Sequence, residues 1–133
     1  MIQDCLKEKV RKFIDKDLAI IDSSGSVAEA AKLMKKHGST SVLVYDERSN
    51  RPIGMLTERD ILYKIVADGK GPYKVTAGEI MSIPLVTVDE NIIVIEAIEL
   101  MKSKSIRQLP VVSNGQVIGM LNMQAIVGKT DYP

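Results

Sequence analysis

The apolar and polar positions of this chain follow one order that occurs twice. In the first copy, residues 18–21 form a short apolar run, which predicts a strand. The next apolar residues have the i, i+3, i+4, i+7 spacing of one helical face: Val27, Ala30, Ala31 and Met34. Residues 42–45 and 53–56 predict the two strands of a hairpin, and residues 57–66 predict a second helix. The predicted repeat is therefore β-α-β-β-α.

The second copy repeats both the pattern and many of the residues. Its strand is residues 85–88, its helical face has Val94, Ala97, Ile98 and Met101, and its hairpin turns at Asn114-Gly115. Ile53-Gly54-Met55-Leu56 returns unchanged as Ile118-Gly119-Met120-Leu121. The offset is 67 residues up to the loop of this hairpin and 65 after the loop, because the first hairpin loop is longer. A constant offset with one loop-sized correction is typical of a duplicated structural unit.

The two predicted long helices begin differently. Ser26 and Glu29 have the spacing of a capping box, which fixes the beginning of the first helix. Ile93 replaces this serine in the second copy, so a weaker cap is expected there. His37-Gly38 predicts the end of the first helix.

The predicted organisation is an α+β module of two repeats. Residues 1–67 contain a short charged helix (residues 3–13) and the first repeat, residues 68–78 form a Gly- and Pro-containing linker, and residues 79–133 form the second repeat. A repeat of about 55–60 residues buries too little surface to be stable alone. We therefore expect the repeats to share one compact module with pseudo-two-fold symmetry.

The composition indicates an ordinary soluble globular protein. Hydrophobic residues make up 45% of the 133 residues, charged residues 26%, and the formal net charge is +1. The absence of a basic excess argues against nucleic-acid binding. No apolar run approaches the roughly 20 residues that span a bilayer, so no membrane association is expected. The single cysteine, Cys5, excludes an internal disulfide and predicts a reducing, cytoplasmic location.

Three segments carry a resemblance to a known family. They are Gly54-Met55-Leu56-Thr57-Glu58-Arg59-Asp60-Ile61, then Glu79 to Ser82 with Pro84 to Val88, and Ser105 to Val112. In this order they resemble the cystathionine β-synthase (CBS) domain, over about residues 10–128. The resemblance implies a CBS pair with two clefts between the copies. Such pairs commonly bind adenosyl compounds (AMP, ADP, ATP, S-adenosylmethionine, sometimes NAD) and regulate an attached or partner protein. Many also dimerise, so a homodimer is expected here. No cofactor is expected beyond such a regulatory ligand, and the regulated protein is unknown.

The main adenosyl site is predicted at the turn that Thr57 begins. A carboxylate such as Asp60 accepts hydrogen bonds from both hydroxyls of a ribose, while Thr57 contacts phosphate and Gly54 lets the ligand approach the backbone. By resemblance, the segment from Ile83 to Val86 receives the adenine. The predicted site comprises Gly54, Met55, Thr57, Asp60, Ile83, Pro84, Leu85, Val86, Ser39, Thr40 and Gln124. The alternative is that Thr-x-x-Asp is only a helix cap.

The second copy departs from this pattern. Its turn reads Asn122-Met123-Gln124-Ala125, so alanine replaces the ribose-binding carboxylate. By resemblance, Arg107 and Arg59 supply positive charge for phosphate. An exposed surface arginine is an equally good interpretation of Arg107 and the better one of Arg59. The predicted second, degenerate site comprises Arg107, Met120, Asn122, Ala125, Arg59, Leu18 and Ala19. Two unequal sites are therefore expected.

These residues are compatible with three functions. The favoured hypothesis is a regulatory module that binds an adenosyl compound between the repeats and signals to a partner protein. The alternative is a structural dimerisation scaffold whose ligand sites are degenerate. An enzyme is the weakest hypothesis, because the sequence has no nucleophile beside a base, no metal-ligand cluster and no phosphate-binding loop.

Overall fold

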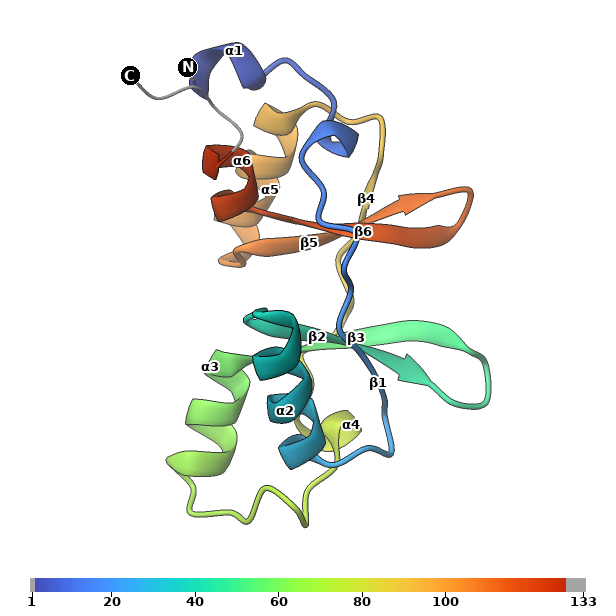
Figure 1. Ribbon diagram of the computed structural model, residues 1–133, viewed down its shortest axis with the longest axis vertical. Helices are drawn as coiled ribbons and strands as arrows, with labels where there is room; N and C mark the ends of the chain where they lie inside the picture. Colours follow the sequence, from blue (N-terminus) through green and yellow to red (C-terminus); the bar gives the residue numbers. More distant parts are fainter. Residues whose placement is uncertain (1, 129–133) are drawn as a thin grey trace. The chain divides into compact units, whose positions relative to one another are not determined.

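The structure is a computed structural model that describes residues 2–128, and its contacts divide the chain into two compact units (Figure 1). The central unit is Leu18–Leu85. The terminal unit combines the residues up to Asp17 with those from Val86 onward. The segment that precedes the first strand of each sheet therefore packs in the other unit. We call residues 9–15 and 76–82 the lead-in segments.

The central unit is built on a three-stranded mixed sheet. Strand β1 (Ile20–Asp22) pairs in parallel with β2 (Ser41–Asp46), which pairs antiparallel with β3 (Arg51–Thr57). The helices are α2 (Val27–His37), α3 (Glu58–Ile61), its continuation η2 (Leu62–Val66) and α4 (Ala77–Ile80). Their apolar faces meet the sheet in one core, whose fully buried members are Val27, Ala30, Val42, Val44, Leu56 and Ala77.

The terminal unit repeats this arrangement. Strand β4 (Val88–Asp89) pairs in parallel with β5 (Gln108–Ser113), which pairs antiparallel with β6 (Gln116–Asn122). Its helices are α1 (Ile2–Cys5), η1 (Val10–Lys12), α5 (Val94–Lys104) and α6 (Met123–Gly128). The order β-α-β-β-α predicted for each repeat is confirmed. Within residues 2–128, no helix is both long enough and apolar enough to cross a membrane.

The ends of the two long helices follow the sequence prediction, except that only one of the two hydrogen bonds of the predicted Ser26–Glu29 capping box forms among the described residues. Ser26 Oγ accepts a hydrogen bond from the Glu29 amide at 3.1 Å, whereas Ile93 provides no side-chain cap to α5. At the other end, Gly38 adopts a left-handed conformation with φ of 61°. Ser105 holds the equivalent left-handed conformation with φ of 55°, although it carries a Cβ.

The lead-in segments differ from the sequence prediction. The single helix predicted for residues 3–13 is wrong: it is broken between α1 and η1, because Lys9 pairs with Ile93 and the Val10 amide donates to Ile92 O at 2.9 Å. The end of the predicted linker is also structured. Thr76 caps α4 and forms a capping box with Glu79, so the helix begins inside residues 68–78.

Other predicted elements have different extents. The strand predicted for residues 18–21 runs instead from Ile20 to Asp22. Of residues 85–88, only Val88 belongs to a strand, which continues to Asp89. The helix predicted for residues 57–66 has Thr57 as its N-cap, and its second part is wider than an α-helix. The Ala67 amide there donates to Leu62 O, an i to i+5 bond that defines a π-type turn.

Candidate functional site

The candidate site is the turn between β3 and α3 in the central unit. Thr57 is extended, with φ of −107° and ψ of 164°, and its Oγ1 accepts from the Asp60 amide at 3.2 Å. The Asp60 carboxylate in return accepts from the Thr57 amide at 2.9 Å. This is a complete capping box, so Thr57 and Asp60 do cap α3. Ligand binding at the same residues stays a prediction.

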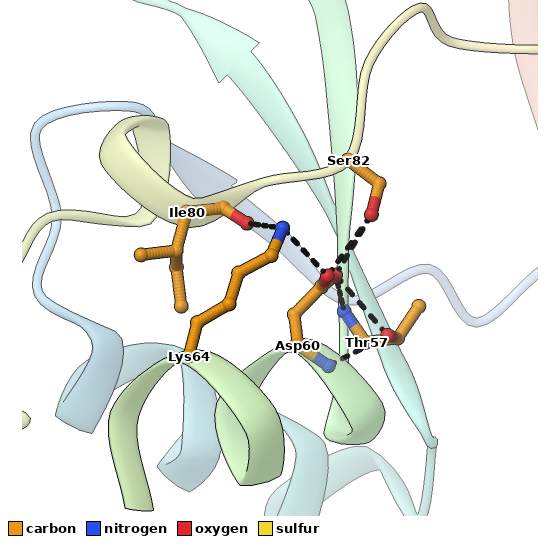
Figure 2. A network of polar contacts seen from close by, with 5 residues as sticks. All are labelled: Thr57, Asp60, Lys64, Ile80 and Ser82. Atoms are coloured by element: carbon orange, nitrogen blue, oxygen red, sulfur yellow. Dashed lines mark hydrogen bonds and ion pairs between the residues drawn. The ribbon is translucent and has the colours of Figure 1, made fainter. Parts of the chain in front are cut away.

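The Asp60 carboxylate has more partners than a cap requires (Figure 2). Lys64 Nζ lies 3.0 Å from Oδ1, one turn along the helix. Ser82 Oγ donates to the same carboxylate, with distances of 3.0 Å and 3.2 Å to its two oxygens. Lys64 Nζ also donates to Ile80 O at 2.8 Å. The network therefore connects α3 with the lead-in segment 76–82.

Asp60 is one of the few polar residues buried in the described chain, with 7% of its surface exposed. A buried carboxylate is stable only when charge and hydrogen bonds compensate for lost hydration. Here Lys64 supplies the opposite charge from a side chain that is 44% exposed, and hydroxyl and amide donors supply the rest. The turn therefore holds a carboxylate that is already arranged to accept hydrogen bonds from hydroxyl and amide groups.

The lead-in segment lies directly against β3 at this site. The Ser82 amide donates to Met55 O at 2.7 Å, and the Met55 amide donates to Ser82 O at 3.1 Å. A Cβ on Gly54 would lie 2.7 Å from Met81 Sδ and 2.9 Å from Ser82 O. Glycine is therefore required at residue 54 for the close approach of the lead-in segment.

The structure gathers several predicted residues of the main site around this turn. Thr40 O accepts from the Glu58 amide at 3.0 Å, which places the residue beside the beginning of α3. Ser39 is half-buried, and its hydroxyl donates to Ser41 O at 2.9 Å. Ile83 is 67% exposed and is joined to Pro84 by a cis peptide bond. Leu85 is half-buried at the end of the unit.

The remaining predicted residues lie in the terminal unit or away from the turn. Val86 and Gln124 belong to the terminal unit, as do the second-site residues Arg107, Met120, Asn122 and Ala125. Arg107 is exposed and Met120 is buried. The other second-site residues, Leu18, Ala19 and Arg59, belong to the central unit. Arg59 is exposed and lies over the ring of Tyr63, 5.2 Å from its centroid.

Lys64 and Ser82 were not among the predicted residues of the site. Lys64 stands four residues after Asp60, a spacing at which opposite charges meet on a helix, so this pair was visible in the sequence. The Ser82 contact spans 22 residues and depends on how the lead-in segment packs. No local pattern in the sequence predicts this contact, although Ser82 lies in one of the segments that carry the family resemblance.

Asp22 and Tyr45 have shifted pKa values and lie at paired positions of β1 and β2, outside the Asp60 network. Burial alone would raise the pKa of Asp22. Hydrogen bonds with the side chains of Ser24 and Glu47 and with the nearby backbone outweigh that effect and lower its pKa. Burial raises the pKa of Tyr45, the register partner of Asp22. Both residues belong to the end of the sheet where β1 finishes.

Comparison with known proteins identifies the fold of both repeats. The family model of the CBS domain matches residues 10–67 and again residues 77–130. An uncharacterised protein of Methanopyrus kandleri is 44% identical over 108 residues, which cover 80% of this chain and 55% of that protein. A CBS domain-containing protein of Bacillus subtilis is 30% identical over 84% of this chain and 78% of its own length.

The solved structures agree with the sequence comparison. A hexameric CBS-CP12 protein from bloom-forming cyanobacteria superposes with a TM-score of 0.84 and 30% identity, covering 92% of this chain and 71% of that one. The chain spans little more than half of the Methanopyrus relative, so the activity of that longer protein is not transferred to it.

Proposed function

The chain belongs to the CBS-domain family as a tandem pair of these domains, and from this premise we propose that it is a regulatory module that binds an adenosyl compound. The ligand would be AMP, ADP, ATP or S-adenosylmethionine, held at the β3–α3 turn of the central unit. Its occupancy would then be passed to a partner protein.

One observation carries this proposal: a buried carboxylate that already accepts a hydroxyl donor through both oxygens. Ser82 Oγ contacts Oδ1 and Oδ2 of Asp60 at 3.0 Å and 3.2 Å. A ribose presents two adjacent hydroxyls, which suit the two oxygens of one carboxylate. Thr40 and Thr57 beside the carboxylate offer further polar groups to the rest of a nucleotide.

The same turn supplies a route for a signal. Lys64 and Ser82 connect Asp60 to the lead-in segment, which continues along the chain into Val86 and the terminal unit. A ligand that changes the Asp60 contacts would therefore change the restraints on this segment. Regulation follows only if the partner binds the two states with different affinity.

A structural assembly module is the second candidate function. The observation that favours it is the exposed apolar surface of η2, where Leu62, Tyr63 and Val66 are 54%, 55% and 64% exposed. The cyanobacterial CBS-CP12 protein is described as hexameric, so assembly occurs in a related chain. In this hypothesis the Asp60 network is only a helix cap.

Ligand-dependent stability separates the two functions. Thermal unfolding would be followed with AMP, ADP, ATP, S-adenosylmethionine and NAD, on the wild type and on Asp60→Asn. A ligand at about 100 times its dissociation constant stabilises the native state by roughly 2.7 kcal/mol. We expect a rise in Tm for the wild type that is lost in Asp60→Asn.

The matched control is Asp15→Asn, which changes an exposed aspartate at a lead-in segment of the terminal unit. This variant should keep the ligand response of the wild type. Failure of all five compounds to raise the wild-type Tm, together with a stable oligomer by light scattering, would reject the regulatory function and support the assembly module.

A further inference from the structure

Four donors surround the Asp60 carboxylate. An ionised carboxylate has about four lone-pair positions. Those of Asp60 face Thr57 N at 2.9 Å, Thr57 Oγ1 at 3.1 Å, Lys64 Nζ at 3.0 Å and Ser82 Oγ at 3.0 Å. No acceptor position is left for a ligand hydroxyl unless one of these donors leaves.

The four donors differ in how firmly they are held. The Thr57 amide donates to Asp60 within the capping box, and the Thr57 hydroxyl is held beside the carboxylate because its oxygen accepts from the Asp60 amide in the same box. Displacing Thr57 would therefore disrupt the beginning of α3. Lys64 supplies the compensating charge, and removing it would leave a buried carboxylate unpaired. Removing either residue from the carboxylate would therefore destabilise the folded state.

Ser82 is the donor that can leave at least cost. The residue is exposed, so its hydroxyl can find water when it leaves Asp60. Its backbone remains fixed by both hydrogen bonds to Met55, at 2.7 Å and 3.1 Å. A rotation about χ1 alone would therefore release the carboxylate without moving the lead-in segment.

We propose that the Ser82 hydroxyl is an internal competitor that occupies the position of a ligand hydroxyl on Asp60 and thereby sets the affinity of the site for a vicinal diol. This inference rests on the proposed function of the turn. In the free protein, Ser82 completes the shell of the carboxylate. In the bound protein, Ser82 turns to solvent and the two sugar hydroxyls take its place beside Oδ1 and Oδ2, both of which Ser82 Oγ contacts in the free protein.

The test is the affinity of Ser82→Ala for the adenosyl compound that stabilises the wild type most, measured by isothermal titration calorimetry. Since the ligand no longer displaces a protein hydrogen bond, the dissociation constant should fall about three- to tenfold. The gain should disappear with the 2′,3′-dideoxy analogue, which lacks the diol. It should also disappear in the Ser82→Ala/Asp60→Asn double variant.

The matched control is Ser24→Ala, because the Ser24 hydroxyl also donates to an aspartate carboxylate in the central unit, Asp22, at 2.9 Å. This variant should bind as the wild type does. Equal or weaker binding by Ser82→Ala, or an equal gain in Ser24→Ala, would overturn the competitor role while leaving the regulatory function intact. Absence of binding by both the wild type and Ser82→Ala would overturn both proposals.

Discussion

The two units place the same backbone contacts around different polar chemistry. In the central unit, Ser82 exchanges two backbone hydrogen bonds with Met55 on β3. In the terminal unit, Asp15 exchanges two with Met120 on β6, at 2.8 Å and 2.9 Å. Gly119 is packed against Ile14 and Asp15 much as Gly54 is packed against the other lead-in segment. The backbone scaffold is therefore repeated without its site.

The carboxylate lies on a different segment in each unit. In the central unit it is Asp60 on α3, and the lead-in segment supplies the hydroxyl of Ser82. In the terminal unit the sequence has Ala125 and Asp15 at the corresponding positions. The Asp15 side chain is exposed and accepts from the Asp17 amide at 2.9 Å, closing a local turn. The lead-in segment of the terminal unit therefore pairs with its strand without a counterpart of the Asp60 network.

The largest expected effect tests whether the two cores are equivalent. Leu56 and Leu121 occupy matching positions on β3 and β6, and both are fully buried. Replacing either by alanine removes apolar contacts and leaves a cavity, so each should lower the free energy of unfolding by about 2–5 kcal/mol. Urea denaturation measures both losses.

Leu62→Ala is the matched control, because Leu62 is 54% exposed and should change stability little. A core substitution that is tolerated in one unit but not in the other would break the structural equivalence.

An intermediate effect should separate the polar chemistry of the units. Asp60→Ala removes a buried carboxylate and leaves the Thr57 amide and Lys64 without this acceptor. We expect a loss of about 1–3 kcal/mol in the free energy of unfolding. Asp15→Ala changes an exposed side chain and should remain within about 0.5 kcal/mol of the wild type. Equal losses in the free energy of unfolding would show that the two carboxylates contribute equally to stability.

The smallest effect concerns the ends of α2 and α5. Ser105 has the left-handed conformation that Gly38 has in the other unit. Because glycine adopts this conformation without strain from a Cβ, Ser105→Gly should raise stability by about 0.5–1 kcal/mol, whereas Gly38→Ser should lower it. Ser105→Ala keeps the Cβ and serves as the control. A gain in this control equal to that of Ser105→Gly would exclude backbone strain as the cause.

The sequence predicted what depends on local pattern and on the repeat. The capping role of Ser26 and its loss at Ile93 were readable, because a cap involves residues only three positions apart. Thr57 and Asp60 were found for the same reason. The offset between the copies identified the matching elements of both sheets.

Long-range contacts account for what the sequence did not predict. Residues 3–13 look helical in isolation, but Lys9 and Val10 take backbone partners at Ile93 and Ile92 instead. Ser82 has no local reason to approach Asp60 and reaches it only through its pairing with Met55. Tertiary pairing overrides local preference at both lead-in segments.

The exchange of lead-in segments has a consequence for how such a chain can be divided. A gene broken between the two sequence repeats, within residues 68–75, would separate the segment 76–82 from the sheet that it covers. The same break would leave residues 9–15 on a different polypeptide from β6. Each product would contain one complete sheet together with the lead-in segment that pairs with the other sheet. The two repeats must therefore be encoded together, because neither half of the gene would contain both a sheet and the lead-in segment that packs on it.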